Sequence, residues 1–452
     1  MFMGGSILSV SAVFVLAAAG PVVADPSGSP LQQVQQELHV ERPVYEGPTL
    51  TLQSTLDEAL TKNPELIALR KQFEATRLRP AQERFLSPPM LEAQIWQWPV
   101  TSVNPLDTNM YMFMVTQDLP GRGKRALKAA VAEKDVEMSE NAIAVRARQV
   151  VGDVKSAYAA LFVARRAIDV HLDGVDLLRQ FADLTEAKYA AGRISQQDVL
   201  KAVVELSKVH DDLVTMYQQA QRAAAQLNTL LDRRPDAPIG PLAEPHERVL
   251  LPVVAELQAL ALRTHPELRA AHLEFERAQA EVAVAKRDYK PDFSVQSGYM
   301  LTPRGDDGIL ARVGITWPRA PWSRGKLDLR VAETTAIGEA ASARLKAVEN
   351  GLRLAVQDAY IRVKAAEEHA SLLRTSLIPL TEQTVEVARI GYQSDRVDFL
   401  ALLDNQRGLL GMQLDYVKAL SDFEQALADL ERAVGTELPP TMISALNTTE
   451  TH

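Results

Sequence analysis

The sequence predicts a mainly α-helical protein with a small β portion, built as a two-fold internal repeat of helix, β-hairpin, long helix, turn and helix. Three observations lead to this prediction. The stretch from Arg125 to Tyr189 contains no proline and repeats apolar residues every 3.5 positions on average, as a coiled-coil seam does. Two pairs of short segments alternate with period two, which is typical of β-hairpins. The same order of features recurs about 202 residues later.

The composition excludes several classes of function. The chain has 452 residues, a net charge of −9 and no cysteine. Its mild acidity and lack of a basic block argue against a nucleic-acid partner. The absence of cysteine excludes disulfide scaffolds, thiolate metal sites and cysteine nucleophiles. The eight histidines show no metal-ligand spacing, and no catalytic or nucleotide-binding motif stands out, so the sequence predicts neither an enzyme nor a cofactor or metal site.

The N-terminus is predicted to be a secretory signal peptide, residues 1–24. Ile7–Ala19 forms an apolar core, and Val22-Val23-Ala24 precedes the expected cleavage point. A single transmembrane anchor is the alternative, although the apolar run is shorter than the ~20 residues that a membrane span needs. Residues 25–50 are rich in Pro, Ser, Gln and Gly and are expected to be extended. No other stretch is apolar enough to cross a membrane as a helix, so a further crossing would need β-strands.

The first repeat is predicted over residues 51–231. One helix begins at Thr51 and fades near Pro80 or at Ser87-Pro88-Pro89, and a hairpin follows at about 91–117. The long helix, at about 121–190, would be about 100 Å long at 1.5 Å per residue. Gly192 is the expected terminator of this helix, and Ser195 is the expected N-cap of the helix that returns to residue 231.

The second repeat is predicted over residues 252–435. A proline-rich linker at 232–251 precedes it, and a C-terminal tail at 436–452 follows it. Its hairpin is expected at about 292–317 and its long helix at about 322–391.

One offset relates the two repeats. Asn63-Pro64-Glu65-Leu66 recurs 202 residues downstream as His265-Pro266-Glu267-Leu268. The coiled-coil seam repeats at the same offset, so that Val363 matches Leu161 and Leu380 matches Leu178. Two independent features that agree on one offset indicate a duplication. Pro379 lies inside the second long helix and is expected to kink or loosen it.

Three groups of motifs occur in the same order in both repeats. They are the Pro-Glu-Leu motif, the strand-to-helix exits, and the turn that ends each long helix. The Pro-Glu-Leu motif is Asn63–Leu66 in the first repeat and His265–Leu268 in the second, and the strand-to-helix exits are Asp118–Arg125 and Trp322–Lys326. The turn motifs are Tyr189–Gly192 and Asp198–Leu200 in the first repeat, and Gly391-Tyr392, Val397–Leu400 and Leu403-Asp404 in the second. Together, from Thr51 to Gly435, they resemble the TolC-like outer-membrane efflux factors. The exits are most similar to the branch that serves heavy-metal and multidrug pumps of the resistance-nodulation-division (RND) type.

This resemblance implies a homotrimer in the outer membrane. Three protomers would give four strands each to a 12-stranded β-barrel, and their helices would continue it as an α-helical barrel through the periplasm. The resemblance also implies a passive exit duct for metal ions or drugs, joined to a periplasmic adaptor and an inner-membrane RND transporter. Two alternatives stay open: a duct for type I protein secretion, and a periplasmic coiled-coil scaffold without a pore.

The resemblance further implies acidic residues around a closable aperture at the turn end. The matching carboxylates are Asp198, Asp398 and Asp404, and Arg396 is a candidate partner for one of them across helices. The turn tips themselves are marked by Tyr189, Gly192 and Tyr392. The alternative is that these charges are solvated helix ends, since aspartate is also favoured near helix N-termini.

Met110, Met112 and Met114 alternate along one predicted strand. They are therefore expected to share one face of the sheet, with Tyr111 and Phe113 on the other face. Thioethers suit Cu(I), but we expect that one face meets lipid and the other packs or lines a lumen.

Overall fold

The structure is a computed structural model that describes residues 42–104, 107–243, 248–250, 253–438 and 443–445. It divides into two compact units. One unit is Arg42 with Leu172–Asp212, and the other is Pro43–His171 with the described residues from Leu213 onward. The signal peptide expected at residues 1–24 lies outside the described residues.

The first repeat contains more helices than the sequence analysis expected. The prediction of one continuous helix from Thr51 to Pro80 or Ser87 is wrong, because the chain leaves the helical conformation at Asn63 (φ −57°, ψ 121°). The proline at position 64 disfavours the α region for the residue before it, and the Asn63 side chain then accepts the N–H of Glu65 at 3.0 Å as the cap of a new helix. The helices are α2 (Leu52–Lys62), α3 (Pro64–Thr76), α4 (Arg79–Arg84), α5 (Lys124–Ala190) and α6 (Gln196–Leu230).

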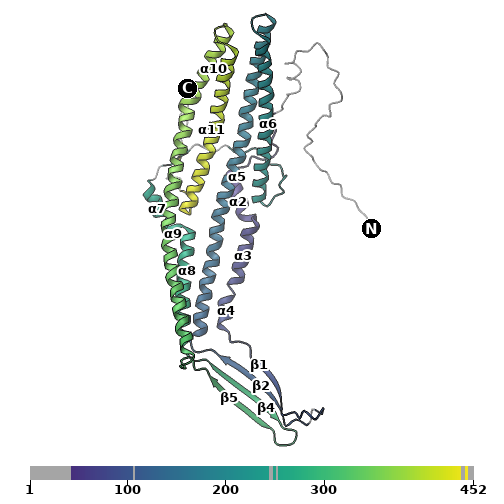
Figure 1. Cartoon of the computed structure of the whole chain (residues 1–452), viewed down its shortest axis with the longest axis vertical. Helices are drawn as coiled ribbons and strands as arrows, with labels where there is room; N and C mark the ends of the chain where they lie inside the picture. The colour runs from purple at the N-terminus through teal and green to yellow at the C-terminus, as the bar shows by residue number, and fades with distance from the viewer. Residues whose placement is uncertain (1–41, 105–106, 244–247, 251–252, 439–442, 446–452) are drawn as a thin grey trace, which may run out of the picture. The chain divides into compact units, whose positions relative to one another are not determined.

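The second repeat follows the same plan. Its helices are α7 (Val254–Thr264), α8 (Pro266–Arg287), α9 (Arg324–Leu372), α10 (Ile378–Gln393) and α11 (Phe399–Val434). Both α8 and α11 pack along α9 (Figure 1). Two short strands not expected from the sequence, β3 (Arg248–Leu250) and β6 (Ile443–Ala445), pair with each other. Over the described part of the chain, none of the helices is both long and apolar enough to span a membrane.

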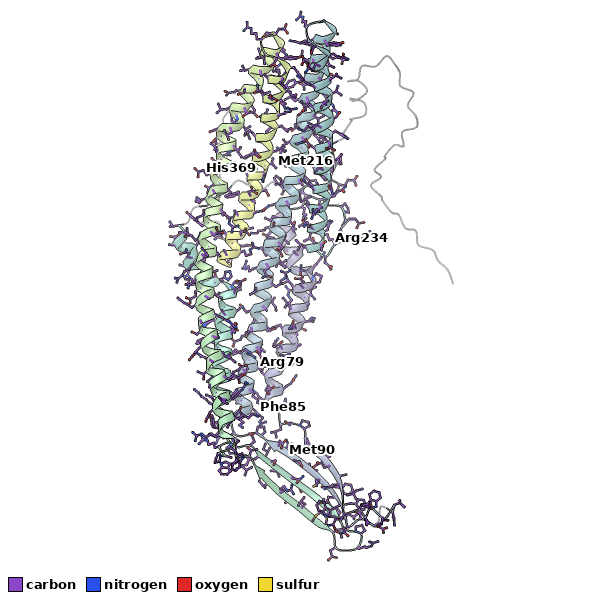
Figure 2. The ribbon with its side chains drawn as sticks, viewed as in Figure 1. Arg79, Phe85, Met90, Met216, Arg234 and His369 are labelled. Atoms are coloured by element: carbon purple, nitrogen blue, oxygen red, sulfur yellow. The ribbon has the colours of Figure 1, made fainter. Side chains whose placement is uncertain are left out.

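The two predicted hairpins are confirmed, and they join into one antiparallel sheet (Figure 1). Its strands are β1 (Met90–Trp96), β2 (Met110–Leu119), β4 (Phe293–Leu301) and β5 (Gly308–Ile315), in the order β1-β2-β4-β5. The central pair is therefore one strand from each repeat, with Met112 opposite Met300. Figure 2 labels Phe85 and Met90, which mark the path of the chain from α4 into β1.

The duplicated core confirms the offset of 202 residues. In the first repeat, Ala59 of α2 packs in a buried cluster with α5 residues; in the second, Ala261 of α7 packs with α9 residues. Within these two clusters, four buried positions of α5 match four buried positions of α9 at this offset. They are Val150, Val154, Ala157 and Leu161 on α5, and Leu352, Val356, Ala359 and Val363 on α9.

The offset changes to 203 beyond a π-helical turn. This turn, η2 (Leu373–Leu377), lies just before Pro379, and the N–H of Ile378 bonds to the carbonyl of Leu373, five residues back. Pro379 has no N–H for the carbonyl of Thr375, which favours this looser turn and confirms the expected loosening. A π-helical turn accommodates one extra residue, which explains the change of offset.

The match of Leu380 with Leu178 is therefore wrong. Leu178 is 5% exposed, whereas Leu380 is 59% exposed. Beyond η2 the buried residues are displaced by one position and are Val385, Ala388 and Tyr392. The offset of 203 persists in the return helices, where Ala223, Leu227 and Leu231 match Ala426, Leu430 and Val434.

Candidate functional site

The first tip is the turn between α5 and α6. Gly192 takes the left-handed conformation (φ 69°), and its N–H bonds to the carbonyl of Tyr189 at 2.8 Å. Ser195 directly precedes α6, as expected for its N-cap. Asp198 lies in the first turn of α6, and its carboxylate is 3.8 Å from the ammonium of Lys201. Asp198 is therefore a helix-end charge with a neighbouring cation.

The second tip, between α10 and α11, builds the same turn from different residues. Asp395 (φ 60°) takes the left-handed position that Gly192 takes in the first tip. Tyr392 is buried and its ring lies 5.8 Å from that of Phe399. The carboxylate of Asp398 accepts the N–H of Ala401 at 3.2 Å and caps α11.

The charged side chains of the second tip differ in the contacts that they make. Asp398 is committed to capping a helix. The Asp404 side chain is 61% exposed, and its nearest cation is Arg407 on the same helix, at 3.3 Å. Arg396 is exposed and forms no ion pair with any residue that the structure describes. Asp404 and Arg396 are thus exposed charged side chains of this tip, and neither of them caps a helix.

The sheet has two chemically different faces. The face of odd-numbered residues is mainly apolar and exposed; it includes Leu91, Ile95, Phe113, Val115, Val295, Tyr299, Leu301, Ile309, Val313 and Ile315, with Gln117 and Ser297 as its polar members. The opposite face carries the polar side chains Glu92, Gln94, Thr116, Gln296 and Arg312 together with Met110, Met112, Met114, Met300, Trp96 and Leu310. The expectation that the methionines share one face is confirmed, and it is the polar face.

The two repeats are tied together where strands become helices. The carboxylate of Asp292, just before β4, accepts the N–H of Gly121 at 2.6 Å and lies 2.9 Å from the ammonium of Lys124. Burial alone would raise the pKa of Asp292, but these two donors outweigh it and hold the pKa below its ordinary value. Gly121 is required here, because a Cβ would lie 2.4 Å from the carbonyl oxygen of Pro291.

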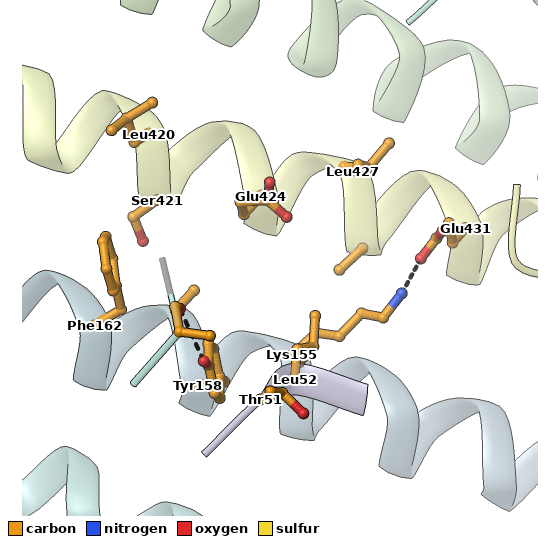
Figure 3. Close-up of a pocket in the computed structure, with 13 residues that line it drawn as sticks. Thr51, Leu52, Lys155, Tyr158, Phe162, Leu420, Ser421, Glu424, Leu427 and Glu431 are labelled. Atoms are coloured by element: carbon orange, nitrogen blue, oxygen red, sulfur yellow. Dashed lines mark hydrogen bonds and ion pairs between the residues drawn. The ribbon is translucent and has the colours of Figure 1, made fainter. Parts of the chain in front are cut away.

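A cavity of about 240 Å³ lies between α5 and α11 (Figure 3). Lys155 of α5 and Glu431 of α11 form an ion pair beside it, with side chains 14% and 10% exposed. The hydroxyl of Tyr158 lies 2.9 Å from the carbonyl oxygen of Leu50, to which it donates. The Lys155–Glu431 pair joins the two repeats, whereas the Tyr158 hydrogen bond ties α5 to the segment just before α2. The pair could not be predicted from the sequence, because neither Lys155 nor Glu431 belongs to a motif and their proximity depends on how the repeats pack.

Family comparison gives an independent view of the duplication. A family model described as "Outer membrane efflux protein" matches residues 55–233 and again residues 257–436. The two matched segments begin 202 residues apart and end 203 residues apart, in agreement with the one-residue shift at η2.

Individual relatives match over most of the chain. The cobalt-zinc-cadmium resistance protein CzcC of Cupriavidus metallidurans is 24% identical over 404 residues, covering 85% of this chain and 90% of that protein. Nodulation protein T of Rhizobium leguminosarum bv. trifolii is 22% identical and covers 64% of each chain.

Solved structures share the fold. The outer-membrane channel OprN superposes with a TM-score of 0.70 at 20% identity, covering 89% of this chain and 95% of that chain. The MtrE outer membrane channel of Neisseria gonorrhoeae superposes with a TM-score of 0.71 at 17% identity, covering 86% and 89%.

Proposed function

This chain belongs to the outer membrane efflux protein family, and from that membership we propose that it is the exit duct of a tripartite efflux pump. It conducts substrates passively from an inner-membrane RND transporter and a periplasmic adaptor to the exterior, with no catalytic step of its own. The observation that carries this proposal is the two-faced sheet, with an apolar face for lipid and a polar face for an aqueous lumen.

A homotrimer completes the duct. Strands β1 and β5 are the two edges of the four-stranded sheet, and each edge offers a row of backbone groups for another strand. Three copies would pair these edges and close a 12-stranded barrel. Helix α9 supports the same assembly with exposed apolar side chains suited to a neighbouring protomer, namely Leu329, Ile337, Leu354, Ile361 and Leu372. The alternative, a periplasmic scaffold without a pore, would not explain why one face of the sheet is apolar and exposed.

The aperture lies at the helical tips, which face the adaptor. Asp404 and Arg396 carry accessible charge there, whereas Asp398 serves mainly as a helix cap and Asp198 as a helix-end charge. In the trimer, Arg396 of one protomer pairs with Asp404 of another and holds the aperture closed. Exposed ion pairs contribute only about 0–1 kcal/mol each, so an adaptor that rearranges the helices opens such an aperture easily.

The substrates we propose are metal ions, with drugs as the second class. The name of CzcC concerns cobalt, zinc and cadmium, and this relative matches most of the chain. The experiment is expression in a Gram-negative host that lacks its own efflux channels, together with a metal-exporting pump and adaptor. We expect a trimer in the outer-membrane fraction and restored metal tolerance. A protein recovered only from the soluble periplasmic fraction would contradict the proposal.

A further inference from the structure

The connection from β5 to α9 is longer than its counterpart in the first repeat. Four residues, 120–123, lead from β2 into α5, whereas eight residues, 316–323, lead from β5 into α9. Both connections join a strand to the helix that follows it, so the shorter one shows that four residues are enough for this join. The additional length in the second repeat therefore calls for another explanation.

The longer connection places two tryptophans on the surface. Trp317 is 67% exposed and Trp322 is 83% exposed, and their rings meet edge to face at a centroid distance of 6.0 Å. An exposed pair of indole rings is unfavourable in water, but indole is the side chain that membrane–water interfaces favour.

Cations accompany the tryptophans. Arg319 is exposed and has no ion-pair partner among the residues that the structure describes; its guanidinium lies 5.7 Å from the ring centre of Tyr289. Arg324 is 67% exposed, and its only partner in the described chain is Asp328 at 3.7 Å. Near the tryptophans in sequence, the guanidinium of Arg319 is thus available to an anion, and that of Arg324 is exposed with one counter-ion at 3.7 Å.

The order of these side chains follows the layers of a membrane leaflet. Val313 and Ile315 belong to the exposed apolar face of the sheet, and Trp317 follows two residues later. Arg319 comes after Trp317, and α9 then leads away from the sheet. From Val313 to Arg319, apolar, aromatic and cationic groups in this order match acyl chains, interface and headgroups, and Trp322 and Arg324 add a second aromatic and a second cation where α9 begins.

We propose that Trp317, Arg319, Trp322 and Arg324, the Trp-Arg surface, bind an anionic phospholipid of the inner leaflet of the outer membrane. The guanidinium groups contact the headgroup phosphate, and the indoles lie at the level of the acyl-chain ester groups. This inference rests on the proposed function, because that function puts the sheet in the bilayer and α9 in the periplasm. The inner leaflet is the source, since the surface lies at the helical end of the strands.

The test uses a Trp96→Phe, Trp98→Phe background, in which Trp317 and Trp322 are the remaining tryptophans and their fluorescence is excited selectively. The trimer is placed in nanodiscs of zwitterionic lipid that contain equal fractions of brominated phosphatidylglycerol or brominated phosphatidylcholine. We expect stronger quenching by the anionic lipid. Arg319→Gln should reduce the relative association constant of the anionic lipid about fivefold, since one cation near an anionic membrane surface contributes roughly 1 kcal/mol.

Lys208→Gln is the matched control, because it removes one exposed positive charge from α6, outside the Trp-Arg surface. It should leave the lipid preference unchanged. Equal quenching by the two brominated lipids would overturn the proposal. Absence of quenching by either lipid would also overturn it, and would show that a second copy of the chain covers the tryptophans. Channel conductance in zwitterionic bilayers should be the same for all these variants, so a failure of this inference is distinguishable from a failure of the proposed function.

Discussion

At the scale of single residues, the two repeats perform the same task with different chemistry. Asn63 caps α3 with its side-chain oxygen, and His265 caps α8 with its ring nitrogen Nδ1, which accepts the N–H of Glu267 at 3.2 Å. The other ring nitrogen, Nε2, lies 3.2 Å from the carbonyl oxygen of Arg432. His265 is therefore neutral in the fold, and burial lowers its pKa from the ordinary value of 6.5.

This difference predicts a pH dependence of stability. Because the pKa of His265 is lower in the folded state, the unfolded chain binds a proton first as the pH falls, and stability is lost below about pH 6.5. His265→Asn copies Asn63 and should remove this loss, which we expect to be about 1 kcal/mol, the typical value of an N-cap. Thermal unfolding of both proteins between pH 5 and pH 8 measures it. Identical pH profiles would contradict this account.

At the scale of elements, the sequence was enough to predict the order of helices and hairpins, because period and proline placement are local signals. It was not enough to predict the register beyond η2. Proline at position 379 indicated a loosened helix, but the size of the adjustment depends on how Val385 and Tyr392 pack against other elements. The break at Asn63 could not be predicted from periodicity, because the apolar pattern continues through this position. The helix nevertheless ends there, because a residue before proline disfavours the helical conformation. At the tips, the sequence left two roles open for Asp398, a charge at the aperture or a helix-end charge, and the structure shows that its side chain caps α11.

The one-residue insertion at η2 is open to direct test. Deletion of Thr375 together with Pro379→Leu should convert η2 to α-helix and leave Val385 and Ala388 buried, with little change in trimer yield or melting temperature. Deletion of Gln180 from the regular helix α5 is the control, because it turns all later α5 residues by about 100° relative to the earlier ones. We expect that control to abolish assembly. Equal damage from both deletions would show that η2 does not absorb an extra residue.

At the scale of the whole molecule, the proposed aperture predicts how tip charges control the pore. Asp404→Asn combined with Arg396→Gln should raise the open probability of the isolated trimer, since both members of the proposed pair between protomers are lost. Asp398→Ser is the matched control, because serine at this position copies Ser195 of the first tip and keeps a helix cap. Single-channel recordings compare the variants. An unchanged open probability in the double variant would rule out these residues as the aperture.

Three copies of this chain are proposed to form a conducting duct, and single-channel recording of the purified protein in a planar bilayer measures that conduction. We expect discrete conductance steps from a trimer, with the polar face of β1, β2, β4 and β5 lining the pore. A trimer that inserts into the bilayer but carries no current, including when Asp404 and Arg396 are neutralised, would contradict it.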